Sequence, residues 1–145
     1  EKLPVPVFGE GWEKYSCGDE HSLRREPAVP FALSFERIAK AHVLLNVSPI
    51  FNRGMHDRVP AGMANHAVVL TDENPYLRRT FTDGKELLFY SLEKPDTLCE
   101  QAERALTDVR LREKIAASAY ETFEREYTWK RRAEQILAFA EEVEA

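Results

Sequence analysis

A polar loop near the middle of the chain has the residue types needed to bind a phosphate. Arg53 and Arg58 bound it, with Gly54, His56 and Asp57 between them. A guanidinium group forms charge-assisted hydrogen bonds with phosphate oxygens, and a glycine lets the backbone approach a ligand closely. A helix that begins after the loop would add backbone N–H groups. The loop therefore predicts a phosphate-binding site.

Several of these side chains also have a purely structural interpretation. Arg58 either contacts phosphate or forms an ion pair with Asp57 or another surface carboxylate. His56 either donates a hydrogen bond to a ligand or simply fills the loop. Asn46 and Ser48 lie where the preceding apolar run ends, and Asn46 either contacts a ligand or satisfies backbone groups of the loop. With the loop residues, these two complete the candidate site.

Other kinds of chemistry find no support in the residue spacing. The 4 histidines have no neighbouring ligands at the spacing of a metal site. Cys99 has no histidine near it in sequence that would indicate a nucleophile, and Cys17 lies with His21 in a polar, aperiodic stretch. Glu10, Asp57 and Asp72 follow predicted strands but have no identifiable partner carboxylate. No general base is therefore assigned within the chain.

The elements around the loop follow the order that builds a ligand crevice. Residues 42–47 are a nearly continuous apolar run, which predicts a strand buried on both faces. The loop leads into a short predicted helix over 59–65, and a second apolar strand is predicted over 67–71. Parallel sheets bind ligands beyond the carboxyl ends of their strands, so the polar residues clustered there are the functional candidates.

The rest of the chain continues the alternation. Residues 13–25 are expected to be a polar surface connection. Further strands are expected at 5–8, 28–31 and 86–90. N-cap residues of helices are expected at Ser34, Asn74, Asp108 and Thr128. The pattern predicts an α/β, Rossmann-like three-layer domain with a mostly parallel sheet of about four to five strands and helices at the C-terminus.

Composition limits the class of protein. With 145 residues, the chain predicts one domain. Its 20 basic and 25 acidic residues give a net charge of -5, which argues against a general nucleic-acid binder. No apolar run approaches the length of a membrane span, and the N-terminus has no signal-peptide pattern. The 2 cysteines lie far apart, which favours a reduced, cytoplasmic protein.

Short runs along nearly the whole chain form one pattern: Asn46–Pro49, Gly54–Arg58, Met63–Ala64, Val68–Asp72, Tyr76–Leu77, Phe81, Asp83–Glu86 and Ile115–Ala116. This pattern resembles the C-terminal, nucleotide-sugar-binding half of GT-B glycosyltransferases. The branch it resembles most is that of the group 1 glycosyl transferases that includes the spore-maturation CgeB-like proteins.

The resemblance implies that residues 1–145 are a single Rossmann-like donor-binding domain, truncated at its N-terminus, of a longer two-domain protein. The substrate would be a nucleoside diphosphate sugar, with no further cofactor and no metal, and its diphosphate would lie near Arg53 to Arg58. The acceptor-binding N-terminal domain would lie outside the chain. The fragment alone is therefore expected not to transfer sugar, because transfer needs donor and acceptor held together.

One departure from the family pattern leaves an alternative open. Retaining GT-B enzymes usually place a Glu near the start of the helix predicted at 59–65, where it contacts the donor ribose, and here Pro60 and Ala61 stand there. A non-catalytic GT-B-derived binding or scaffolding module is the alternative. A nicotinamide enzyme is a weaker interpretation, because Gly9-x-Gly11 is followed by Lys14 where a third glycine is expected.

The start of the chain raises a question of sheet pairing. In the doubly wound order a central strand would precede Glu1 and lie between the strands predicted at 5–8 and 43–47. We expect either that these two strands pair directly or that a segment of another copy enters, forming a homodimer through the open sheet edge.

Overall fold

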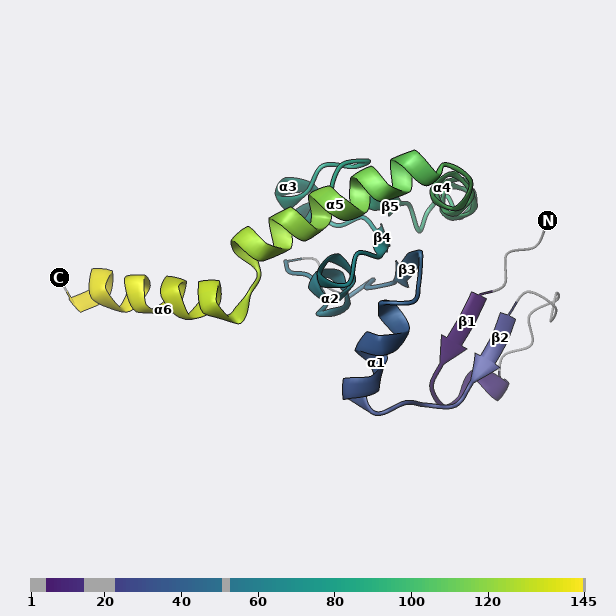
Figure 1. The fold of residues 1–145 in the computed structure, drawn as a ribbon, viewed down its shortest axis with the longest axis horizontal. Helices are drawn as coiled ribbons and strands as arrows, with labels where there is room; N and C mark the ends of the chain where they lie inside the picture. Colours follow the sequence, from purple (N-terminus) through teal and green to yellow (C-terminus); the bar gives the residue numbers. More distant parts are fainter. Residues whose placement is uncertain (1–4, 15–22, 51–52, 145) are drawn as a thin grey trace. The chain divides into compact units, whose positions relative to one another are not determined.

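The computed structural model describes residues 5–14, 23–50 and 53–144 (Figure 1). The chain divides into two compact units, residues 1–36 and 37–145, and each is considered by itself. The expectations about Cys17 lie outside the described residues. The expectation of a single domain stays a prediction.

The first unit contains a two-stranded parallel sheet. β1 (Val5–Phe8) pairs with β2 (Leu23–Glu26), and the short 3-10 helix η1 (Trp12–Lys14) follows β1. The strand predicted at 5–8 is confirmed. The polar connection predicted over 13–25 is wrong in part, because β2 occupies its end. The sequence Leu-Arg-Arg-Glu has no apolar alternation, so only its pairing with β1 identifies it as a strand.

The helix α1 (Phe31–Ile38) begins earlier than its sequence indicates. The carbonyl oxygen of Pro30 accepts hydrogen bonds from the N–H groups of Leu33 and Ser34, which closes the first turn. The Ser34 hydroxyl donates to the carbonyl oxygen of Phe31 at 2.6 Å, so Ser34 lies inside the helix. The predicted Ser34 cap is therefore wrong. The strand predicted at 28–31 is also wrong, since residues 27–30 adopt no regular structure.

The second unit is built on three parallel strands in the order β3-β4-β5. These are β3 (Val43–Asn46), β4 (Val68–Asp72) and β5 (Leu88–Tyr90). They confirm the strands predicted around 42–47, 67–71 and 86–90, with shifted ends. Every residue of β4 is buried. β3 is not buried on both faces as predicted, because Leu45 is 38% exposed and, among the described residues, β3 pairs on one side only.

Within the described residues, β1 pairs with β2 and β3 pairs with β4. The strands predicted at 5–8 and 43–47 belong to different units, so their direct pairing stays a prediction. The alternative, entry of a segment from another copy, stays a prediction.

The helices of the second unit are α2 (Arg58–Ala64), α3 (Pro75–Thr80), α4 (Asp96–Thr107), α5 (Val109–Glu126) and α6 (Trp129–Glu144). Three predicted caps are confirmed by side-chain oxygens that accept from backbone N–H groups. Asn74 accepts from Leu77 at 2.8 Å, and Asp108 accepts from Leu111 at 2.9 Å. Thr128 accepts from Arg131 at 3.3 Å.

Helices cover both faces of this sheet. On one face, Val69 and Phe89 pack with residues of α2, α3 and α5. On the other face, Leu70 and Leu88 pack with residues of α4 and α5. This alternation follows from the two-residue period of a strand, and it confirms the Rossmann-like layered fold. No helix in the described part of the chain is long and apolar enough to cross a membrane.

Candidate functional site

The carboxyl ends of the three parallel strands bring polar side chains together. Asn46 ends β3, Asp72 ends β4 and Tyr90 ends β5. The strand register places Asn46 beside Thr71 and Asp72 beside Tyr90. All four side chains are buried, and Asp72 is only 2% exposed. This is the edge at which the sequence predicted a ligand crevice.

A buried hydrogen-bond network joins two of the candidate residues to β4. The Asn46 side-chain amide donates to the Ser48 hydroxyl at 3.1 Å and to the Thr71 hydroxyl at 2.9 Å. The backbone N–H of Ser48 donates to Asp72 Oδ1 at 2.8 Å. Among the described residues, every buried side-chain nitrogen and oxygen has a hydrogen-bond partner. The network therefore fixes the start of the loop on the sheet.

Tyr90 closes the network from β5. Its hydroxyl donates to the carbonyl oxygen of Asn46 at 3.1 Å. Burial raises the pKa of Tyr90 to about 12, and the negative charge of Asp72 adds to the increase, while the positive charge of Arg58 opposes it. The Asp72 carboxylate and the Arg58 guanidinium therefore both act electrostatically on the same hydroxyl. Arg58 supplies positive charge at the carboxyl edge of the sheet.

Arg58 contacts the loop and not the neighbouring carboxylate. Its Nη2 donates to the carbonyl oxygen of Val47 at 3.4 Å, and its Nε donates to His56 Nδ1 at 3.3 Å. The Asp57 carboxylate lies against the same His56 nitrogen. The structure thus shows no ion pair between Arg58 and Asp57.

The rest of the loop is anchored through Gly54. Its carbonyl oxygen accepts a hydrogen bond from the side-chain amide of Asn74 at 3.3 Å, so the residue that caps α3 also holds the loop. Arg53 is exposed. The structure therefore brings Asn46, Ser48 and Arg58 to one edge, and it leaves Arg53 at the surface.

The start of α2 differs from the expected phosphate cradle. The N–H of Arg58 donates to His56 Nδ1 at 3.2 Å, and the N–H of Val59 donates to the carbonyl oxygen of His56 at 3.0 Å. Pro60 has no N–H. The N–H groups of Arg58 and Val59 are therefore already used within the chain in this conformation, and the arginine side chains remain candidate donors for a phosphate.

Gly62 seats α2 against the sheet. A Cβ atom at this position would lie 2.5 Å from Val69 Cγ2 and 3.0 Å from Leu44 Cδ2. Only glycine permits such a close approach of the helix backbone to β3 and β4. This packing fixes the position of Arg58, which lies one turn earlier on the same helix.

Sequence reasoning named Asp72 but assigned it no partner, and it did not identify Thr71 or Tyr90 as part of the site. Their contacts depend on the register of β3, β4 and β5, which no local pattern reveals. The predicted parallel order of the strands was the one signal for these residues, since it places the last residues of all three strands at one edge of the sheet.

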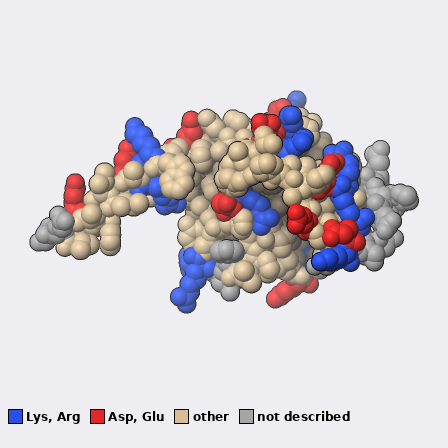
Figure 2. Space-filling view, turned by 90° about the horizontal axis from the view of Figure 1, so that it is seen from below, with Lys and Arg blue, Asp and Glu red and all other residues tan. Residues whose placement is uncertain are grey.

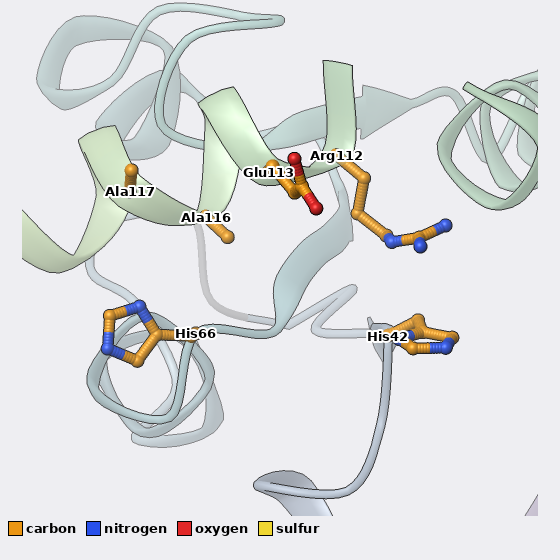
Figure 3. Close-up of a pocket in the computed structure, with 6 residues that line it drawn as sticks. All are labelled: His42, His66, Arg112, Glu113, Ala116 and Ala117. Atoms are coloured by element: carbon orange, nitrogen blue, oxygen red, sulfur yellow. The ribbon is translucent and has the colours of Figure 1, made fainter. Parts of the chain in front are cut away.

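A separate pocket of about 310 Å³ lies at the opposite end of the strands (Figure 3). His42 and His66, which precede β3 and β4, face Glu113 and Arg112 of α5 across it. The Arg112 guanidinium donates to the carbonyl oxygens of Ala105 and Leu106, so it already caps the end of α4. No group of residues in the described ranges could hold a metal ion. This pocket contains none of the candidate residues.

Comparison with known proteins identifies the fold and the family. A family model described as "Glycosyl transferase-like" matches residues 1–138. None of the curated proteins compared with the chain matches it.

Solved structures of glycosyltransferases share the fold. The Anabaena protein HepE, solved in complex with UDP-glucose, matches with a TM-score of 0.72 at 11% identity over 85% of this chain. A glycosyltransferase from Rickettsia africae matches with a TM-score of 0.71 at 10% identity over 86% of this chain. The C-terminal domain of LpcC, a group 1 glycosyl transferase of Francisella tularensis, gives a TM-score of 0.64 at 14% identity over 76% of this chain and 56% of its own.

The match to larger proteins is partial. The chain covers 33% of HepE and 32% of the Rickettsia africae protein. It has the fold of a GT-B C-terminal domain, and it corresponds to about a third of these two structures.

Proposed function

Because the chain belongs to the glycosyl transferase-like family, we propose that it binds the sugar-nucleotide donor of a GT-B glycosyltransferase at the carboxyl edge of β3-β4-β5. The observation that carries the proposal is the meeting of Asn46, Asp72 and Tyr90 at this edge, with Arg58 acting on the same cluster. The buried polar groups at this edge are hydrogen-bonded to one another, and Arg58 adds a positive charge.

The residues divide into two roles. Arg58 binds the donor diphosphate, because a guanidinium recognises phosphate through paired, charge-assisted hydrogen bonds. Asn46 and Ser48 hold the loop on the sheet, since their polar atoms are engaged in the buried network. Arg53, Gly54, His56 and Asp57 complete the loop that would cover the diphosphate. UDP-glucose is the first ligand to test, because HepE was solved with it.

We assign transfer of the sugar to the parent protein. The acceptor would be held by an N-terminal domain, and this fragment alone should bind donor without turnover, because the reaction needs both substrates in one shielded cleft. The CgeB-like branch and a reduced, cytoplasmic setting belong to the same proposal. The proposal of a reduced, cytoplasmic protein rests partly on Cys99, which is a free, exposed thiol.

A non-catalytic binding or scaffolding module is the second candidate. The observation that favours it is the first turn of α2, which carries no acidic residue to contact the donor ribose. Such a module would keep the fold without the affinity for a donor.

Calorimetric titration of the 145-residue chain with UDP-glucose, UDP and uridine distinguishes the two candidates. Donor binding predicts that UDP and UDP-glucose bind measurably more tightly than uridine, because the diphosphate meets Arg58. The absence of binding for every nucleoside diphosphate and sugar nucleotide in a panel of bases would refute donor binding and support the scaffolding module.

A further inference from the structure

Tyr90 joins two strands that are not neighbours in the sheet. The strand order is β3-β4-β5, and the hydroxyl of Tyr90 on β5 donates to the carbonyl oxygen of Asn46 at the end of β3, at 3.1 Å. The Tyr90 side chain is only 5% exposed, so little water competes for this hydrogen bond. Tyr90 therefore fixes the point at which the chain leaves β3 and enters the loop.

The next residue of the loop contacts Arg58. Val47 follows Asn46 directly, and its carbonyl oxygen accepts from Arg58 Nη2 at 3.4 Å. Arg58 Nε donates to His56 Nδ1 at 3.3 Å. Within the described residues, Nη1 is therefore the guanidinium nitrogen that makes no hydrogen bond to the protein. Loop atoms thus orient the guanidinium, and they leave Nη1 and one N–H of Nη2 for a phosphate.

The charges of these two side chains also act on each other. Burial raises the pKa of Tyr90 to about 12, and the positive charge of Arg58 works against this increase. A phosphate bound to Arg58 would offset that positive charge. The Tyr90 ring should therefore report on binding at Arg58.

The orientation of a single arginine matters because the chain carries no net attraction for anions. Its net charge is -5, and in Figure 2 blue basic and red acidic side chains are interspersed over the visible, described surface. Individual cationic groups, and not a broad positive potential, must then hold a phosphate. The affinity for a phosphate consequently depends on how Arg58 is held.

We propose that Tyr90 is a positioning residue for the donor, because its hydroxyl fixes the segment from Asn46 to Val47 that orients the Arg58 guanidinium toward the diphosphate. The inference rests on the proposed function, since it takes Arg58 as the diphosphate contact. Tyr90 touches no phosphate in this role. Loss of its hydroxyl releases the Asn46 carbonyl, so Val47 holds Arg58 less rigidly, and Arg58 must be ordered at the moment of binding.

Calorimetric titration of the 145-residue chain tests the role of the hydroxyl. The ligand is UDP, or the tightest nucleoside diphosphate of the panel if another base binds better. Tyr90→Phe removes one oxygen atom and should weaken diphosphate binding about three- to tenfold, while binding of the matching nucleoside stays unchanged. Tyr120→Phe is the matched control, because the Tyr120 hydroxyl donates to Glu124 within α5, and its loss should leave diphosphate binding unchanged.

A double-mutant cycle separates positioning from a general loss of structure. In the Arg58→Ala background, Tyr90→Phe should change the diphosphate affinity by less than about twofold, because the group that Tyr90 orients is already absent. Equal weakening in the two backgrounds would overturn the inference, since Tyr90 would then act without Arg58.

A measurement on the parent chain needs no variant. The diphosphate should shift the NMR signals of the Tyr90 ring more than those of the Tyr120 ring. Tyr90 ring signals that stay fixed while the diphosphate binds would overturn this inference alone, as would equal affinities of the parent and Tyr90→Phe. Absence of binding by every nucleoside diphosphate would refute the proposed function, and the inference with it.

Discussion

Replacing Asp72 by alanine should lower the free energy of unfolding by about 2 kcal/mol. The carboxylate is 2% exposed, and its Oδ1 accepts the Ser48 backbone N–H at 2.8 Å. A hydrogen bond to a charged group contributes about 1.5–3 kcal/mol, and an unsatisfied buried donor costs about 1–3 kcal/mol. These two estimates describe the same loss and do not add. Removing a buried charge also relieves part of its desolvation cost, which keeps the net effect near the middle of the range.

The asparagine variant separates geometry from charge. Asp72→Asn keeps an oxygen that accepts from Ser48, so we expect a loss of only about 1 kcal/mol. It also removes the negative charge that helps to raise the pKa of Tyr90. That pKa should therefore fall, while remaining above its ordinary value because burial persists. Urea unfolding at neutral pH measures the stability, and tyrosinate absorbance during an alkaline titration follows the pKa.

Glu73→Gln is the matched control, since Glu73 is the next residue and its carboxylate forms an exposed ion pair with Arg78. Exposed pairs contribute about 0–1 kcal/mol, so this variant should remain close to the parent. The reasoning is refuted if Asp72→Ala is no less stable than Glu73→Gln, because the buried network would then not hold the loop.

Three further outcomes follow from the same geometry. Gly62→Ala should destabilise the protein by about 1–3 kcal/mol in urea unfolding, because the new Cβ would lie 2.5 Å from Val69 Cγ2. Gly54→Ala is the control, since a Cβ there has no neighbour within 4 Å, and it should change stability little. The pKa of an unfolded tyrosine is near 10, and that of folded Tyr90 is about 12. The parent should therefore lose up to about 3 kcal/mol of stability as the pH rises through this window, and Tyr90→Phe should lose less. Equal losses in the two proteins would show that folding does not raise the pKa of Tyr90. Arg58→Ala should weaken nucleoside diphosphate binding about ten- to a hundredfold in calorimetry and leave nucleoside binding unchanged; unchanged diphosphate affinity would exclude Arg58 from the site.

The elements that the sequence predicted correctly are those with local signals. The buried strand β4 is a continuous apolar run, and Asn74 and Asp108 cap their helices through side chains three residues from the bonded N–H. Both signals are contained within a few neighbouring residues. β2 was missed because Leu23–Glu26 is mostly charged, and its strand conformation depends on pairing with β1.

In the candidate site, too, the features with local signals were predicted and those that depend on long-range contacts were not. The polar residues after β3 could be identified because strand ends bear ligands in parallel sheets. The partnership of Ser48 with Asp72 spans 24 residues of sequence, and that of Tyr90 with Asn46 spans 44. Such contacts require the register of the sheet, which sequence spacing does not contain. The sequence also predicted free N–H groups at the start of α2. In the structure two of these groups donate hydrogen bonds to His56.

The most direct test of donor binding at the carboxyl edge is an amide chemical-shift titration of the 145-residue chain with UDP. The account predicts that the largest shifts occur at Asn46, Ser48 and Arg58, at the carboxyl ends of the strands. Shifts concentrated instead around His42 and His66, at the opposite end, would contradict it, as would a spectrum that UDP and the other nucleoside diphosphates leave unchanged.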